Sequence, residues 1–219
     1  MRKKTLLLIL ALLAAIAPAF SASLYLRGAL DADYMTNSFS DPLPVSGDED
    51  YREDAEFLKR VNLGFKVEGD IFFHSHDTTG LSLRLAFGFP LSAETTTVAD
   101  PESSDWHYTT SDSLSGQDAD MSFALGPVFR YEAGRFDIML ALRLSAGSFD
   151  LFDSLTLGIQ AEIFTNFFLT SHWFLSAGLT YDVDLIRFID SPVNYYEEDF
   201  TMLSAGGFIG GGYLFGGRK

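Results

Sequence analysis

Apolar and polar residues alternate along most of the chain that follows the N-terminal segment. In residues 60–71, for example, Leu63 and Phe65 lie on one face of an extended chain, and Lys66 and Glu68 lie on the other. A period of two indicates β-strands whose two faces meet different surroundings. Eight segments have this pattern, and they are residues 24–34, 60–71, 81–92, 121–132, 136–146, 155–167, 173–184 and 202–215.

The connections between these segments alternate between long and short along most of the chain. Such an order is typical of an up-and-down meander with one elaborated end. We therefore predict an all-β fold, an eight-stranded antiparallel up-and-down β-barrel. The long connections are residues 35–56, 93–120 and 186–199, the short turns are residues 74–79, 134–135 and 168–172, and residues 147–154 are the exception to the alternation.

Side-chain size indicates which face of the strands points outward. One face carries bulky Leu, Ile and Phe, whereas the other carries mostly Gly, Ala and Ser with scattered charges. The interior of an eight-stranded barrel is only just wide enough for side chains, so the small and charged face fits inside. The bulky face then meets lipid. This favours a transmembrane barrel over a lipocalin-like soluble barrel, which the alternation alone would also fit.

Aromatic residues on the bulky face gather at the ends of the predicted strands. Amphipathic rings prefer the two interfaces of a membrane. A general preference of aromatic residues for strands explains their number but not this placement, so the clustering supports the transmembrane barrel. At the end with the short turns, which we predict to face the periplasm, these residues are Phe73, Phe129, Tyr131, Phe136, Phe167, Trp173, Tyr213 and Phe215. At the end with the long connections, which we predict to face outward from the cell, they are Tyr34, Phe57, Phe89, Phe123 and Tyr181.

Residues 1–21 have the three parts of a secretory signal peptide, which are basic residues at Arg2–Lys4, an apolar run over residues 6–16 and then small residues. A retained transmembrane anchor is the alternative, but the apolar run is shorter than the roughly 20 residues that span a bilayer. We therefore predict a signal peptide followed by a barrel domain of residues 22–219.

The amino-acid composition argues against several classes of partner and site. The formal net charge of −15 makes the chain a poor partner for nucleic acid. The chain has 0 cysteines, which excludes a disulfide framework, a thiolate zinc site and a lipoprotein anchor. After the N-terminal segment, no stretch has the length and purity of a transmembrane helix, so we expect the strands to provide the attachment to outer-membrane lipid.

Charged residues on the small-residue face predict a polar network in the lumen. One layer, near the periplasmic end, is predicted to contain Arg27, Lys66, Glu68, Asp70, Arg84, Arg130, Glu132 and Glu162. A second layer is predicted to contain Asp31, Asp33, Arg60, Arg143, Asp182 and Asp184. Buried charges are costly unless they are paired, so we expect salt bridges that plug the lumen. A gated ion or solute path, in which such pairs exchange partners, is the alternative.

The last predicted strand ends in Tyr213, Leu214 and Phe215. With the signal peptide and the strand count, this ending resembles the small outer-membrane barrels of the OmpA transmembrane-domain, OmpX and OmpW type. The resemblance implies residence in the bacterial outer membrane. It also implies that Tyr213 and Phe215 form the C-terminal signal read by the barrel assembly machinery. In that family the aromatic residue usually closes the chain, whereas residues 216–219 follow it here.

The sequence offers few residues for catalysis, and we expect no enzymatic activity and no cofactor. A base at His107 with Ser103, Ser104 or Ser111 as nucleophile is the only serine and histidine arrangement that suits a lipid-modifying barrel enzyme. Ser and His are common in loops, so we place this reading third.

Two other features concern cations. His74 and His76 next to Asp77 could be a metal pair, but a solvated turn suits them better because no further ligands are identifiable. The long connections over residues 48–56 and 94–120 are strongly acidic. Clustered carboxylates of this kind can simply keep the loop surface hydrated. The alternative is that they bind divalent cations or a basic partner.

Together these features predict a monomeric outer-membrane barrel with a structural or surface-interaction role. The first alternative is a narrow channel for small or hydrophobic solutes, and the lipid-modifying enzyme is the second.

Overall fold

A computed structural model describes residues 23–39, 55–74, 77–99, 107–112, 119–149, 154–189, 196–197 and 200–216. The predicted signal peptide and much of the predicted long connections lie outside the described residues. Among the residues described, there is no helix long and apolar enough to cross a membrane.

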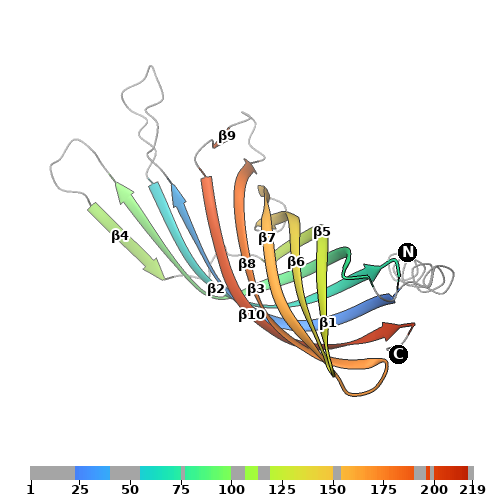
Figure 1. The fold of residues 1–219 in the computed structure, drawn as a ribbon. Coiled ribbons are helices and arrows are strands. Elements are labelled where there is room, and N and C mark those ends of the chain that lie inside the picture. Colours follow the sequence, from blue (N-terminus) through green and yellow to red (C-terminus); the bar gives the residue numbers. More distant parts are fainter. Residues whose placement is uncertain are drawn as a thin grey trace, which may run out of the picture.

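Eight long strands close into an antiparallel barrel (Figure 1). Each pairs with its neighbour along the chain, and the last strand also pairs with the first, with Leu24 opposite Phe215. The predicted all-β, eight-stranded antiparallel barrel is therefore confirmed. The strands are β1 (Ser23–Phe39), β2 (Ala55–Phe72), β3 (Thr79–Ala99), β5 (Asp120–Ala133), β6 (Phe136–Phe149), β7 (Ser154–Phe168), β8 (Trp173–Ile189) and β10 (Phe200–Phe215).

Several strands are longer than the sequence pattern predicts. β3 continues to Ala99, and a short strand that was not predicted, β4 (His107–Asp112), pairs with this extension. A second short strand, β9 (Tyr196–Glu197), pairs with β8. The extension of β3 contains Thr95–Thr97, where the sequence has no apolar alternation. Main-chain pairing needs no apolar face, so the period-two pattern could not detect these parts of the strands.

The two ends of the barrel differ. At the end that we call the turn end, β1 begins, β10 ends, and short turns join β2 to β3, β5 to β6 and β7 to β8, as predicted. Gly134 has a φ of 61° in the two-residue turn between β5 and β6, a conformation that favours glycine. Main-chain hydrogen bonds tie two of the turns to strands, from Phe168 N at the end of β7 to Arg135 O at 2.9 Å and from Leu214 N on β10 to His172 O at 2.7 Å. We call the opposite end the loop end.

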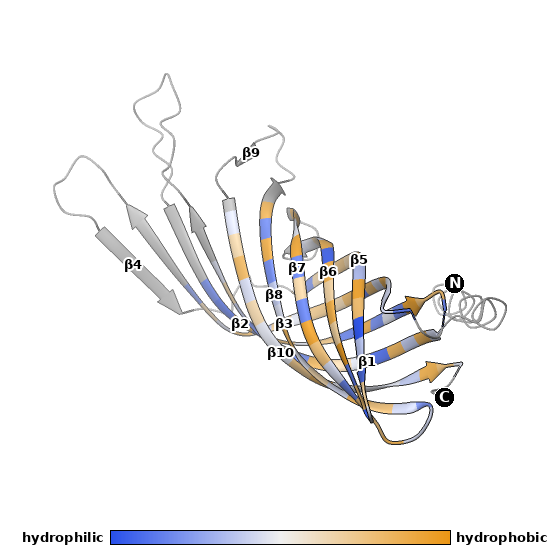
Figure 2. Ribbon diagram, viewed as in Figure 1, coloured by the Kyte–Doolittle hydropathy of each residue, from blue (hydrophilic) through white to orange (hydrophobic). Residues whose placement is uncertain are grey.

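The barrel wall has an apolar outside and a largely polar inside. Figure 2 shows apolar and polar residues alternating along the strands. Large apolar side chains on the outer face are exposed, including Leu144 at 73% and Ile209 at 69%, whereas Arg27, Lys66 and Glu68 on the inner face are buried. This arrangement is the inverse of a soluble barrel, and it agrees with the predicted orientation of the two faces.

Inward-facing glycines on β10 let the neighbouring strands and rings approach closely. A Cβ atom on Gly212 would meet the Leu26 carbonyl oxygen and the ring of Phe174. The space left by Gly212 is thus filled by a neighbouring side chain. Gly69, which also lies within a strand, has no neighbouring atom within 4 Å of its ideal Cβ position.

Gly212→Ala is therefore expected to lower the free energy of unfolding by about 1–3 kcal/mol, the usual cost of overpacking. Gly69→Ala serves as the matched control and should leave that free energy unchanged or slightly raised. Urea titration of the refolded protein, followed by tryptophan fluorescence, measures both. Equal effects of the two substitutions would contradict this account of β10.

Candidate functional site in the barrel lumen

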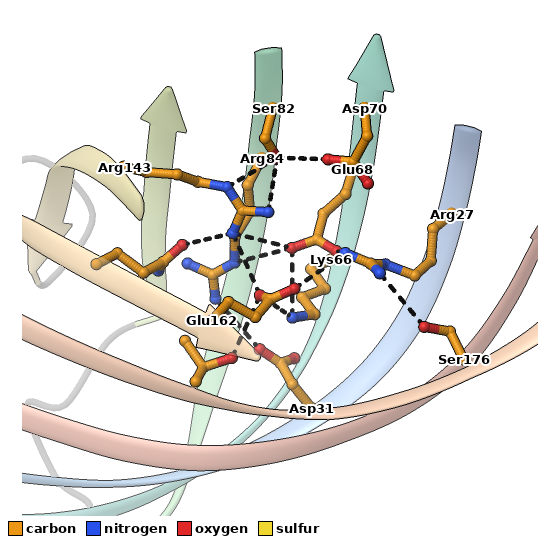
Figure 3. Close-up of polar contacts among 12 residues, drawn as sticks. Arg27, Asp31, Lys66, Glu68, Asp70, Ser82, Arg84, Arg143, Glu162 and Ser176 are labelled. Carbon is orange, nitrogen blue, oxygen red and sulfur yellow. Dashed lines mark hydrogen bonds and ion pairs between the residues drawn. The ribbon is translucent and has the colours of Figure 1, made fainter. Parts of the chain in front are cut away.

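Two buried glutamates, Glu68 and Glu162, organise the middle of the lumen (Figure 3). Arg27 donates hydrogen bonds to Glu68 Oε2 through Nε and Nη2, and its Nη2 also lies 2.9 Å from Glu162 Oε1. Lys66 Nζ lies 2.6 Å from Glu162 Oε2 and 3.3 Å from Glu68 Oε1. One arginine and one lysine therefore bridge both carboxylates.

Arg143 joins the same two glutamates from the other side. Its Nη1 lies 3.5 Å from Glu68 Oε1 and 3.3 Å from Glu162 Oε2. Its Nε and Nη2 donate to Ser82 Oγ at 2.9 and 2.7 Å, and that hydroxyl donates to Asp70 Oδ1 at 2.5 Å. Ser82 thus connects Arg143 to a third buried carboxylate.

Arg84 extends the network towards the loop end. Its Nη2 lies 3.5 Å from Asp31 Oδ2, its Nε lies 3.8 Å from Glu68 Oε1, and its Nη1 donates to Ser122 Oγ at 3.3 Å. The charged members balance, with four basic and four acidic groups, which offsets the cost of desolvation. We call this set the central network, and its charged members are Arg27, Lys66, Arg84, Arg143, Asp31, Glu68, Asp70 and Glu162.

Strand register explains part of this arrangement. Glu68 on β2 lies directly opposite Arg27 on β1 and Arg84 on β3, so opposite charges meet across adjacent strands. Glu162 comes from β7 and meets Arg27 across the lumen rather than along the sheet. Aromatic rings line the same level, because Arg27 Cζ lies 3.7 Å from the ring centre of Phe164.

The loop-end side of the network opens into a cavity of about 90 Å³, which we call the outer cavity. Two of the carboxylates that line it, Asp182 and Asp184, accept hydrogen bonds from neutral groups. Asp182 accepts from Ser145 and Gln160, each at 2.9 Å, and Asp184 accepts from Thr156 at 2.9 Å. A polar cavity of this size has room for ordered water.

Two other predicted residues lie near the outer cavity. Asp33, which lines it, accepts hydrogen bonds from Asn62 at 3.2 Å and Ser204 at 3.3 Å. Arg60 donates from Nε to Asn62 Oδ1 at 2.7 Å and lies 3.1 Å from Asp120. Asn62 and Asp120 were not among the predicted site residues.

At the turn end most of the lumen is filled by aromatic side chains, which pack beside the buried charged residues Arg130 and Asp137. Tyr25, Phe72, Phe168 and Phe174 are all buried. The ring centre of Tyr25 lies 5.7, 6.3 and 5.8 Å from those of Phe72, Phe168 and Phe174. We call these four residues, with Leu214 on β10, the aromatic stopper.

Polar residues anchor the stopper. The hydroxyl of Tyr25 donates to Asp137 Oδ2 at 2.7 Å and accepts from Arg130 Nη1 at 2.9 Å. Arg130 Cζ lies 4.4 Å from the ring centre of Phe72, and Arg130 Nη2 donates to the main-chain oxygen of Asp77 at 2.8 Å. Arg130 therefore ties the stopper to the turn between β2 and β3.

The stopper was not predicted from the sequence pattern. Tyr25 and Phe174 lie in predicted strands but were given no role, and Phe72 and Phe168 lie one residue beyond the predicted strands. Each of these three phenylalanines lies two residues beyond a polar inward residue, at Asp70, Asn166 and Ser176. Continuing the alternation to the strand ends would have placed them inside.

The predicted division into two charged layers is wrong in four places. Asp31, predicted in the second layer, lies 3.5 Å from Arg84 and belongs to the central network. Arg143 belongs to the central network, because it contacts Glu68 and Glu162. Arg130 lies with the stopper. Glu132 has a 46% exposed side chain and lies 3.3 Å from Arg130, so it is outside the buried network. Projection by height along each strand does not account for how far a long side chain reaches.

The predicted assembly signal lies at the turn end of β10. The ring of Tyr213 lies 5.1 Å from that of Trp173 on β8 and 4.9 Å from that of Phe215. Its recognition by the assembly machinery stays a prediction.

The histidine predictions concern mostly residues outside the described set. His76 and the side chain of His107 are not described. His74 is exposed, and its Nδ1 lies 3.1 Å from Asp77 Oδ2 in the turn between β2 and β3. Within the described parts of the chain, there is no group of three or more His, Asp or Glu residues placed to hold a metal ion.

Comparison with known proteins agrees with this architecture. No family model and no curated protein matches the sequence. Among solved structures, the chain is similar to the outer membrane protein OprG from Pseudomonas aeruginosa, with a TM-score of 0.53 and 14% identity over 89% of this chain and 96% of that chain. The chain has the fold of a small outer-membrane barrel.

Two further solved structures match over similar shares of the chain but with lower TM-scores. Ail from Yersinia pestis has a TM-score of 0.43 and 12% identity, covering 89% of this chain and 99% of that chain. Neisserial surface protein A has a TM-score of 0.42 and 14% identity, covering 88% of this chain and 97% of that chain. Identities this low concern the fold alone, and function has to be argued from the lumen and the surface.

Proposed function

We propose that this protein is a monomeric integral protein of the bacterial outer membrane whose lumen is closed, and that it has a structural or surface-interaction role. The filled lumen carries this proposal, because it holds the aromatic stopper and, next to it, the central network. Its ion pairs connect side chains from β1, β2, β3, β6 and β7 across the lumen, and Arg27, Lys66, Glu68 and Glu162 are buried. A path for solutes would have to displace several paired and desolvated charges.

The proposed role places function at the acidic connections of the loop end, where divalent cations or a basic partner would bind. The net charge of −15 supports a cationic partner rather than nucleic acid. We propose no catalytic activity. If millimolar calcium changes neither the proteolysis of the loops nor the thermal stability of the protein, binding of divalent cations at these connections is ruled out.

Planar-bilayer recording tests the closed lumen. The refolded protein is expected to give no steady, discrete conductance. Heat-modifiable migration on gels, which reports a folded barrel, verifies that the sample is folded. Discrete conductance from folded protein would overturn the proposal and favour the narrow channel.

The narrow channel for small or hydrophobic solutes is the second candidate because the outer cavity already provides a polar compartment of about 90 Å³ in the lumen. The third candidate, a lipid-modifying enzyme, would be revived by one result. Lipid from producing cells would have to change in mass, and His107→Ala would have to abolish that change.

A further inference from the structure

The aromatic stopper is built from, or contacted by, all eight long strands of the barrel. Its rings come from β1, β2, β7 and β8, and Leu214 adds β10. Arg130 on β5 and Asp137 on β6 hold the hydroxyl of Tyr25. On β3, a Cβ atom at Gly80 would meet the ring of Phe72, so that ring packs against the β3 main chain. Side chains or main chain from all eight barrel strands therefore take part.

The stopper lies directly beneath the central network. On β1, Tyr25 is the next inward residue after Arg27, and on β2, Phe72 is the next after Asp70. The same step on β8 leads from Ser176, which accepts a hydrogen bond from Arg27 Nη1 at 3.3 Å, to Phe174. A solute that passed the central network would therefore meet the stopper at once.

The two layers resist ions by different physical means. Charged side chains that exchange partners can let water in, because every member keeps a hydrogen-bonding group. The phenylalanine rings of the stopper offer no such groups, and the one hydroxyl of the stopper, on Tyr25, is already bonded to Asp137 and Arg130. An apolar constriction excludes water and ions by dewetting. Phe72, Phe168, Phe174 and Leu214 have no polar side-chain atom, and none of them is more than 4% exposed.

We propose that the aromatic stopper, and not the central network, is the seal of this barrel. The proposal rests on the closed lumen argued above and assigns the closure to particular residues. It follows that loss of ion pairs alone leaves the barrel closed, whereas loss of stopper rings opens it. The hydrogen bonds of Tyr25 with Asp137 and Arg130 hold the tyrosine ring of the stopper in place.

Planar-bilayer recording of four refolded variants and the unmodified protein tests this assignment. The network variant Lys66→Gln/Glu162→Gln removes one charge of each sign and keeps the network neutral. The stopper variant Phe168→Ala/Phe174→Ala removes two rings whose centres lie 5.5 Å apart. The third protein combines both pairs of substitutions. The control Phe136→Ala/Phe167→Ala removes a pair of rings with centres 5.0 Å apart that includes Phe136, which is 46% exposed on the outer face.

The network variant and the control are expected to stay closed like the unmodified protein. The stopper variant is expected to conduct, and the combined variant is expected to conduct more. If the folded stopper variant stays closed, or if the network variant conducts as much as the stopper variant, the proposal is overturned. Conductance by the unmodified protein would instead overturn the closed lumen itself, so the two failures are distinguishable.

Folding of each variant is verified by heat-modifiable migration. If Phe168→Ala/Phe174→Ala does not fold, Phe174→Ala alone replaces it, and the same expectations apply. A folded Phe174→Ala protein that conducts no more than the network variant counts against the proposal.

Discussion

Glu162→Gln is expected to lower the free energy of unfolding by about 3–5 kcal/mol, the usual cost of breaking a buried ion pair from one side. Glu162 lies between three cationic groups, with Lys66 at 2.6 Å, Arg27 at 2.9 Å and Arg143 at 3.3 Å. Glutamine keeps the shape but removes the charge. The three basic groups would then share Glu68 as their nearest carboxylate, and part of their desolvation would no longer be offset.

Reversible urea unfolding of the protein in lipid vesicles measures this change, and Glu132→Gln is the matched control. Glu132 also contacts an arginine, but its side chain is 46% exposed. Exposed ion pairs contribute about 0–1 kcal/mol, so the control should stay within that range. An effect of Glu162→Gln as small as that of the control would show that the central network does not stabilise the barrel.

Leu142→Arg is expected to lower the free energy of unfolding by about 2–4 kcal/mol, the cost of a cation on the lipid face near the bilayer midplane. Leu142 is 41% exposed and lies near the middle of β6, opposite Ala161 on β7. In a soluble barrel an arginine at the same position would face water and cost little. The substitution therefore tests the lipid-facing assignment directly.

Two further variants complete this test. Tyr131→Arg places the same charge at the turn end, where Tyr131 is 69% exposed, and should cost about 0–1 kcal/mol because it lies near an interface. Leu142→Ala measures the loss of the apolar side chain without a charge. Equal costs of the two arginine substitutions would contradict the membrane placement of the barrel.

The extent of sequence-based prediction differs between the wall and the lumen. The alternation in residues 60–71 correctly places Lys66 and Glu68 inside and Phe65 outside, because the period of a strand is local and independent of the partner strand. The extension of β3 beyond residue 92 was missed, since its pairing with β2 and β4 depends on main-chain groups that every residue has.

The site was predicted as a set of residues but not as an arrangement. The inward position of Arg143 follows from the strand pattern, whereas its contacts with Glu68 and Glu162 depend on side chains that reach across the lumen. The stopper was missed because its aromatic residues are unusual on a face that is otherwise small and charged, and because they lie at the ends of the predicted segments.

The sequence by itself determined that this chain forms eight antiparallel strands with a bulky face towards lipid and a small, charged face inside. Only the tertiary structure decided which charges meet, where the outer cavity lies and that aromatic rings close the turn end. The physical reason is that face and strand follow from a residue's neighbours along the chain. Contacts in the lumen instead depend on closure of β10 against β1, which joins residues almost two hundred positions apart, such as Leu24 and Phe215.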